Sequence, residues 1–292
     1  MLALPLLLAG SLINDVRTLI DARNLPAAEQ KVRAAGKTSE AAAALSWIAR
    51  GELAAKQYAE ADRTALQTRA MSDALLHNRR LDADPYLPTA VGASIEVHAQ
   101  ALTAQGQRSE AIPYLQQQAK LFAGTSIVER IRKNLNLLSM EGKPAPQLDA
   151  TAWLGPKPPT LTSLRGKVTL LFFWAHWCGD CKQEVAILAN LHSRFGQRLA
   201  IVGPTRFYGY VAGGNEAPPA VEKPYIDAVR RQFYSALPDM SAPLSAVNFQ
   251  TYGASTTPTL VLIDRGGIVR YYHPGAVSES ELGARIQALL AR

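Results

Sequence analysis

The spacing of apolar residues divides the chain into two parts. From Ser11 to Met140 apolar residues recur with a helical period, and no alternating strand pattern appears. The segment from Glu141 to Pro146 breaks this period, and strands and helices alternate after it. We therefore expect an all-helical domain over 12–140, a linker over 141–146 and an α/β domain over 147–292, because a chain of 292 residues is long enough for two domains.

The helical half contains three similar segments, each a short turn that leads into a helix rich in small residues: Leu25-Pro-Ala-Ala-Glu, Tyr58-Ala-Glu-Ala-Asp and Arg108-Ser-Glu-Ala-Ile. The first two are offset by 33 residues, and the third follows 50 later because Leu81–Pro88 interrupts the helices. This offset is close to the period of a tetratricopeptide repeat, and the pattern resembles a degenerate tetratricopeptide-like array of helical hairpins. Such an array would dock a partner or a second copy of the chain, and the alternative is a plain helical bundle that shields or spaces the second domain.

The second half predicts a mixed sheet with helices on both faces. Its expected elements are buried strands over Val168–Trp174 and Leu199–Gly203, a helix from about Pro224 to Ala236, a hairpin of Thr259–Asp264 with Ile268–Tyr272, and a final helix that ends at Leu290. Capping boxes at Ser126–Glu129 and Ser278–Glu281 predict the starts of the last helix of each half.

Both cysteines of the chain lie in one motif, Cys178-Gly-Asp-Cys181, where a buried strand passes into a helix. A helix N-terminus stabilises a thiolate, and a thiolate attacks disulfides, so the spacing favours a redox-active pair. A structural zinc site would need further ligands at zinc spacing, and a c-type haem would need His in place of Lys182. A purely structural disulfide stays open as an alternative. We expect no metal and no cofactor.

The net charge of +7 divides into about +2 before Gly142 and +5 after it, without a long basic run, so we expect no nucleic-acid binding. Residues 1–11 are apolar and end in small residues, which indicates the remnant of a secretion signal, although no basic region precedes them. The alternative is an apolar first helical turn. We expect a periplasmic or otherwise exported protein, tethered to a membrane or free, with the cytoplasm as the alternative location.

The second half resembles the thioredoxin superfamily, and more closely its exported TlpA/ResA-type thiol-disulfide oxidoreductases. The matching stretches are Leu161–Val168, Phe173–Lys182 and Tyr252–Asp264, in the family's order. The resemblance covers residues 143–292 and implies an α/β thioredoxin-like fold with a mixed central sheet and flanking helices, here preceded by the all-α helical-hairpin domain.

The resemblance also implies the roles of individual residues. Cys178 would be the nucleophile and Cys181 the resolving thiol, joined as a disulfide in the oxidised protein. Thr257 and Pro258 align with the family's cis-proline segment, whose backbone pairs with an extended substrate, and Trp177 would contact the same substrate. The alternative for Pro258 is an ordinary proline at a strand start.

Two positions depart from the thioredoxin pattern. The buried acid of thioredoxin is replaced by Phe172, whereas the acid of the TlpA/ResA type matches Glu184, which would accept the proton of Cys181. The alternative is a solvated surface glutamate paired with Lys182 or another neighbour. Asp180 lies between the thiols and opposes thiolate formation, so we expect a thiol pKa not far below the ordinary value and a reducing potential.

The sequence predicts a protein-disulfide reductase whose partners are disulfide-containing client proteins, a membrane or soluble thiol donor and a protein bound by the helical domain. One alternative is a thiol peroxidase, whose motif needs Pro and Thr where this chain has Leu171 and Ala175. Another is a non-catalytic envelope scaffold or redox sensor. The segment from Arg206 to Lys223 is a candidate substrate-selecting loop with aromatic contacts, or else a passive insertion.

Overall fold

The computed structural model describes residues 11–77 and 79–291 of the chain. The chain forms two compact units, Met1–Asn134 and Leu135–Arg292. The predicted remnant of a secretion signal lies outside the described residues except for Ser11, whose hydroxyl caps the first helix.

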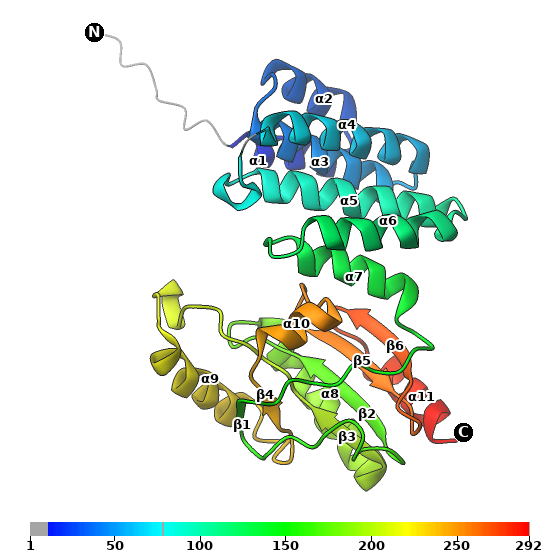
Figure 1. Ribbon diagram of the computed structural model, residues 1–292, viewed down its shortest axis with the longest axis vertical. Helices are drawn as coiled ribbons and strands as arrows, with labels where there is room; N and C mark the ends of the chain where they lie inside the picture. Colours follow the sequence, from blue (N-terminus) through cyan, green and yellow to red (C-terminus); the bar gives the residue numbers. More distant parts are fainter. Residues whose placement is uncertain (1–10, 78, 292) are drawn as a thin grey trace. The chain divides into compact units, whose positions relative to one another are not determined.

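The first unit is built from helices, and each packs against helices one or two places away in the sequence (Figure 1). They are α1 (Leu12–Asp21), α2 (Leu25–Ala34), α3 (Ser39–Ala54), α4 (Tyr58–Leu76), α5 (Leu87–Ala104) and α6 (Arg108–Leu121), and α7 (Val128–Ser139) spans the boundary between the units. The three similar segments of the sequence each begin a helix, namely α2, α4 and α6.

The turns before these three helices are alike. Each has a residue in the left-handed conformation, namely Arg23 (φ 58°), Lys56 (φ 62°) and Gly106 (φ 83°). The next residue donates its N–H to the carbonyl five positions back, from Asn24, Gln57 and Gln107 to Leu19, Glu52 and Leu102 at 2.8–2.9 Å. This is the Schellman arrangement that ends a helix. A fully buried alanine then follows in each new helix: Ala28, Ala61 and Ala111. The three segments are therefore structurally equivalent.

One predicted helix start forms differently. Ser126 does not cap α7, because its hydroxyl and its amide both donate to the carboxyl group of Asp82. The helix starts at Val128 instead.

The second unit contains a four-stranded sheet of order β3-β2-β5-β6. The strands are β2 (Val168–Phe173), β3 (Leu199–Val202), β5 (Thr259–Ile263) and β6 (Val269–Pro274), and a separate pair is formed by β1 (Trp153–Leu154) and β4 (Ala242–Pro243). The helices are α8 (Gly179–Phe195), α9 (Pro219–Phe233), α10 (Ala246–Tyr252) and α11 (Glu279–Leu290). Strand β2 is parallel to β3 and antiparallel to β5.

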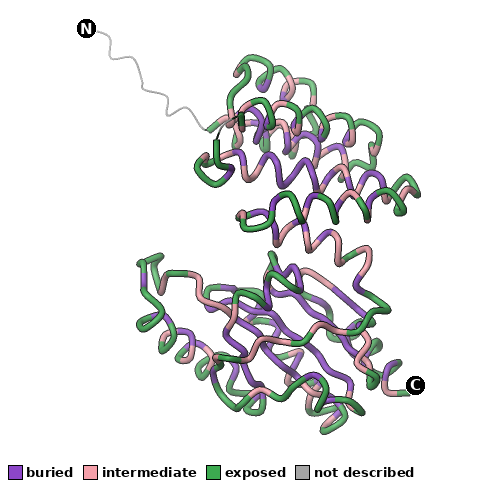
Figure 2. Tube along the Cα trace, viewed as in Figure 1, coloured by how far each residue is buried: buried purple, intermediate pink, exposed green. Residues whose placement is uncertain are grey.

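The sheet is covered on both faces, as predicted, so that β2 and β5 are buried along their whole length (Figure 2). Alternate residues of β2 point to opposite faces. Leu170 and Phe172 join the core under α8 and α11, whereas Leu171 and Phe173 join a second core with α10. Strand β2 is thereby fixed, and the cysteine motif follows directly after it.

Two predicted boundaries differ from the structure. Helix α9 starts at Pro219 rather than near Pro224. Proline is well tolerated at the first helical position, which Pro219 occupies, and Pro224 is accommodated within the helix. The segment predicted as a linker is built into the second unit: Met140 is buried in its core, and residues 142–145 pair with residues 267–269, which lead into the edge strand β6.

Candidate active site

The two cysteines form a disulfide at the start of α8, with the sulfurs 2.08 Å apart. Strand β2 ends at Phe173, and Cys178 is the N-cap residue of α8. The unpaired N–H groups and the positive end of the helix dipole therefore face the sulfurs. In the reduced protein this environment stabilises a thiolate.

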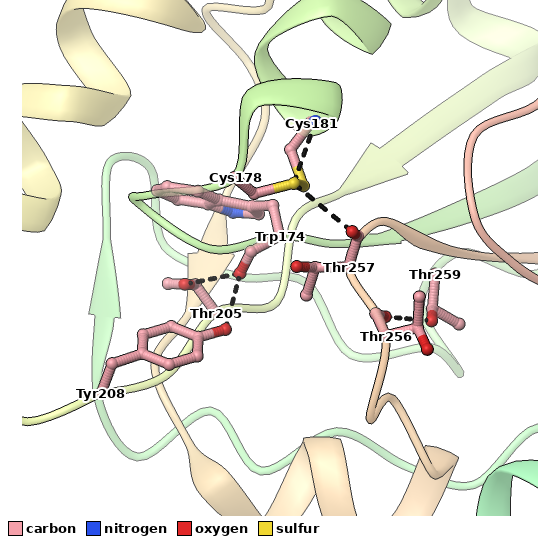
Figure 3. Close-up of a disulfide and its surroundings, with 8 residues drawn as sticks. All are labelled: Trp174, Cys178, Cys181, Thr205, Tyr208, Thr256, Thr257 and Thr259. Carbon is pink, nitrogen blue, oxygen red and sulfur yellow. Dashed lines mark hydrogen bonds between the residues drawn. A yellow bond between two sulfur atoms is a disulfide. The ribbon is translucent and has the colours of Figure 1, made fainter. Parts of the chain in front are cut away.

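The sulfur of Cys178 has two close polar neighbours (Figure 3). It accepts the backbone N–H of Cys181 at 3.0 Å, and it lies 3.5 Å from the carbonyl oxygen of Thr257. A disulfide sulfur carries no hydrogen, so the second contact becomes a hydrogen bond only when Cys178 is a thiol. Cys178 is 4 % exposed and Cys181 is fully buried, so an incoming group reaches Cys178 first.

The segment opposite the disulfide is held by a cis peptide bond between Thr257 and Pro258. This is the conformation that the family resemblance implies. The hydroxyl of Thr259 donates to the carbonyl of Thr256 at 2.6 Å and ties the segment to the start of β5. The carbonyl of Thr257 is thus left to face the sulfurs (Figure 3).

Glu184 lies on α8 one turn after Cys181, which places both residues on one face of the helix. Its side chain is 2 % exposed and accepts the backbone N–H of Val277 at 3.3 Å. The alternative of a solvated glutamate does not describe this side chain, because it is buried. The Lys182 ammonium lies 4.4 Å from the ring centroid of Phe233.

The charge of Glu184 is disfavoured in this environment. Burial raises the pKa of its carboxyl group, the hydrogen bond from Val277 opposes this shift, and the charge of Asp180 adds to it. Glu184 also lines a cavity of about 300 Å³ with Asp180 and Gln183 of α8 and Val277. A buried carboxyl group with a raised pKa beside such a cavity has the properties of a proton acceptor and donor.

The end of β2 is held by hydrogen bonds to the segment after β3. The carbonyl of Trp174 accepts the hydroxyl of Thr205 at 2.9 Å and that of Tyr208 at 3.4 Å (Figure 3). The indole N–H of Trp174 donates to the carbonyl of Gly203 at 2.8 Å. Phe172, at the position of the thioredoxin acid, is fully buried in the core.

Other predicted site residues differ in their exposure. Trp177 is 50 % exposed beside Cys178, and Asp180 is exposed in the first turn of α8. Thr257 is half-buried. Across the described ranges 11–77 and 79–291, no group of three or more histidine, cysteine or acidic side chains is arranged to hold a metal ion.

Sequence reasoning missed Glu222, which lies in the first turn of α9. It contacts His176 of the cysteine loop, residues 174–178 between β2 and α8. The predicted helix began after this residue. Glu222 is fully buried, although glutamate is almost never fully buried without partners.

A mixed sheet, a C-x-x-C disulfide at the start of the helix after the central strand, and a cis-proline opposite the sulfurs together define a thioredoxin-like dithiol-disulfide protein. Comparisons with known proteins agree. Residues 142–203 match the AhpC/TSA family. The thioredoxin-like protein YneN of Bacillus subtilis is 24% identical over 50% of this chain and 78% of its own length.

The thiol:disulfide interchange protein DsbE of Allochromatium vinosum is 30% identical over 51% of this chain and 75% of its own length. Among solved structures, the thioredoxin-like superfamily protein SPOA0173 matches with a TM-score of 0.41 at 23% identity, over 51% of this chain and 97% of its own. The chain belongs to the thiol:disulfide interchange proteins of the thioredoxin-like superfamily and is an oxidoreductase with a redox-active disulfide.

Proposed function

We propose that this protein reduces disulfides of client proteins outside the cytoplasm, through a cycle of Cys178 and Cys181 between dithiol and disulfide. The observation that carries the proposal is the position of the Cys178 sulfur, which accepts an N–H of α8 and faces the carbonyl of Thr257. One atom is thus both activated as a nucleophile and placed beside a backbone edge that pairs with a substrate.

The cycle has two exchanges. The Cys178 thiolate attacks one sulfur of a client disulfide, which forms a mixed disulfide and releases the other client sulfur as a thiolate. The Cys181 thiolate then attacks the Cys178 sulfur and releases the second client thiol. Two electrons pass to the client, and the protein is left with the Cys178–Cys181 disulfide, which an external thiol donor reduces again.

Glu184 serves the second exchange in this proposal. Cys181 is fully buried and must lose its proton before it attacks. Glu184 is on the same face of α8, and its raised pKa lies nearer to that of a thiol than an ordinary carboxyl group does. It takes the proton of Cys181, directly or through water in the adjoining cavity.

Client binding in this proposal uses the main chain of Thr257 and the exposed ring of Trp177. An extended client segment adds to the backbone of Thr257, which Pro258 leaves free of the sheet ladder. Trp177 is 50 % exposed beside Cys178 and supplies apolar contact area. The helical unit serves to bind a protein partner or a second copy of the chain.

The location outside the cytoplasm rests on the resemblance to exported reductases and on the absence of any cysteine beyond the active pair, since no other thiol is then open to oxidation. In the part of the chain that is described, no helix combines the length and apolar character needed to cross a bilayer.

The alternative of a thiol peroxidase is favoured by one observation, the match of residues 142–203 to the AhpC/TSA family. The peroxidase motif is nevertheless incomplete at Leu171 and Ala175. The test compares catalytic reduction of insulin with reduction of hydrogen peroxide, with dithiothreitol as donor. We expect turnover on insulin that is lost in Cys178→Ser. Turnover on peroxide alone would establish the peroxidase, and no turnover on either would contradict both.

The reduction potential of the Cys178–Cys181 pair tests the direction of electron flow. A potential near that of thioredoxin, about −270 mV, is expected of a reductant, whereas a value near −120 mV would mark an oxidant.

A further inference from the structure

A buried histidine lies two residues before Cys178 and is surrounded by tyrosines. His176 is 2 % exposed. Its ring centroid is 5.4 Å from that of Tyr208 and 5.3 Å from those of Tyr210 and Tyr225, with all three rings near-perpendicular to it. Two of these tyrosines belong to the segment after β3 and the third to α9, so one side chain of the cysteine loop contacts both elements.

Glu222 completes this cluster from the first turn of α9. Its carboxyl oxygens accept the backbone N–H groups of Tyr208 at 2.6 Å and of Gly209 at 2.9 Å. One of these oxygens lies 3.5 Å from Nε2 of His176, which is longer than an ordinary hydrogen bond. A buried carboxylate is costly unless it is hydrogen-bonded, so this arrangement is stable only while the segment is held against α9.

The surroundings of His176 favour the neutral form of its imidazole. Burial lowers the pKa of His176, the Glu222 carboxylate opposes this shift, and the positive charge of Lys182 adds to it. Its contact with Glu222 is long, whereas three tyrosine rings surround it, so the main contribution of His176 is its packing against these rings.

These contacts position the side chain of Tyr208. Its ring meets that of Trp177 at a centroid distance of 5.6 Å and an interplanar angle of 82°, and its hydroxyl donates to the carbonyl of Trp174 at 3.4 Å. Figure 3 shows the Tyr208 ring close to the cysteine loop. The exposed ring of Trp177 is thus supported from one side by Tyr208, which fixes an aromatic surface next to Cys178.

We propose that Trp177 and Tyr208 form a client-selecting surface that favours an apolar side chain next to the reacting cysteine of the client, and that Glu222 and His176 position this surface. The proposal rests on the proposed disulfide reductase function and deepens it. Aromatic rings bury large apolar areas at low entropic cost, which suits an apolar client side chain. The guanidinium of Arg206 lies 5.2 Å from the Tyr208 ring centroid. Its positive charge disfavours a cationic client side chain at this surface.

The test uses two disulfide-linked peptides that differ only in the residue before the cysteine, leucine or lysine, together with 2-hydroxyethyl disulfide as a substrate without side chains. For the wild type we expect kcat/KM to be about tenfold higher for the leucine peptide, mainly through a lower KM. Glu222→Gln replaces one of the two oxygens that accept backbone N–H groups with an amide NH2 group, which cannot accept them. The segment therefore loosens, and the ratio of the two kcat/KM values falls towards one. Tyr208→Ala lowers the ratio in the same way.

Glu216→Gln is the matched control, because Glu216 is an exposed glutamate of the same segment, and it should keep the wild-type ratio. The reduction potential of the cysteine pair separates positioning from a general structural role, and we expect it to be unchanged in Glu222→Gln. If that variant does not fold, Tyr208→Ala supplies the same comparison.

Equal kcat/KM for the two peptides in the wild type would overturn the proposal. A loss in Glu222→Gln that is equal for both peptides and the small disulfide, with a shifted potential, would also overturn it, because Glu222 would then support the cysteine loop itself. Failure to reduce any of the three substrates would instead contradict the disulfide reductase function.

Discussion

The sulfur of Cys178 lies 3.5 Å from the carbonyl oxygen of Thr257, although 79 positions separate the two residues in the sequence. The carbonyl belongs to the residue before the cis-proline, at the start of β5. In the proposed function, a client strand that pairs with this backbone is brought to the sulfur by the same contact that binds it. Binding and orientation for attack are therefore coupled, which favours the in-line approach that exchange needs.

The two cysteines should give different products when each is replaced by serine. Cys178→Ser should abolish reduction of disulfides, whereas Cys181→Ser should accumulate a mixed disulfide with clients, because attack proceeds and resolution does not. Mass spectrometry of the trapped species measures this and identifies the client. Adducts that form through Cys181 alone would reverse the assignment of the two thiols.

Glu184→Gln should slow the resolution step by about 100-fold, the lower end of the range for general acid-base catalysis. The side chain keeps its size and loses only its ionisable group. Stopped-flow measurement of the decay of a mixed disulfide monitors this step directly. Glu279→Gln is the matched control, since Glu279 is an exposed glutamate at the start of α11. Wild-type kinetics in Glu184→Gln would remove Glu184 from the mechanism.

Glu184 should also affect stability in a pH-dependent manner. Burial raises the pKa of the Glu184 carboxyl group in the folded protein. The stability that this group contributes is fully present below its unfolded-state pKa of about 4.3, and it is lost as the pH rises through the raised folded-state pKa. Glu184→Gln should therefore gain in Tm over the wild type as the pH rises, with little gain in acid. Thermal unfolding of the oxidised proteins across this range measures the effect, and a gain that does not change with pH would contradict it.

Ala61→Leu should destabilise the helical unit by about 1–3 kcal/mol, because Ala61 is fully buried and the added atoms overpack the start of α4. Ala59→Leu, on the exposed face of the same turn, is the control and should change stability little. Denaturant unfolding followed by circular dichroism checks both variants. Equal effects of the two substitutions would show that the buried alanine at the start of α4 has no packing role.

The sequence predicts the sheet well where burial on both faces leaves a clear apolar run, as in β2 and β5. It also predicts the start of α11, because the Ser278 hydroxyl accepts the N–H of Glu281 as a capping box requires. Strands β1 and β4 have two residues each, which is too short for any period to be visible. Helix α10 is seven residues long, which is likewise too short for a helical period to stand out in the sequence.

The candidate site divides in the same way. The relative positions of Cys178, Cys181 and Glu184 follow from their spacing along one helix, so they can be predicted from the sequence. The contact of His176 with Glu222 joins the cysteine loop to the first turn of α9 through the tertiary fold, and no local pattern predicts it. Ser126 illustrates the opposite error, since its capping pattern is present but its hydroxyl binds Asp82 from a distant turn.

The segment before the second unit's first strand has a consequence for aggregation. Strand β6 is at the end of the sheet, and its outer side is paired by the N–H of Gly142 to the carbonyl of Val269 at 2.8 Å and by the N–H of Val269 to the carbonyl of Lys143 at 2.9 Å. A fragment that begins at residue 147 would leave this edge open to strand addition by another copy, whereas one that begins at residue 135 keeps it covered. Light scattering should therefore find the shorter fragment self-associated and the longer one monomeric. By covering the edge of β6, residues 140–145 would then prevent intermolecular sheet formation.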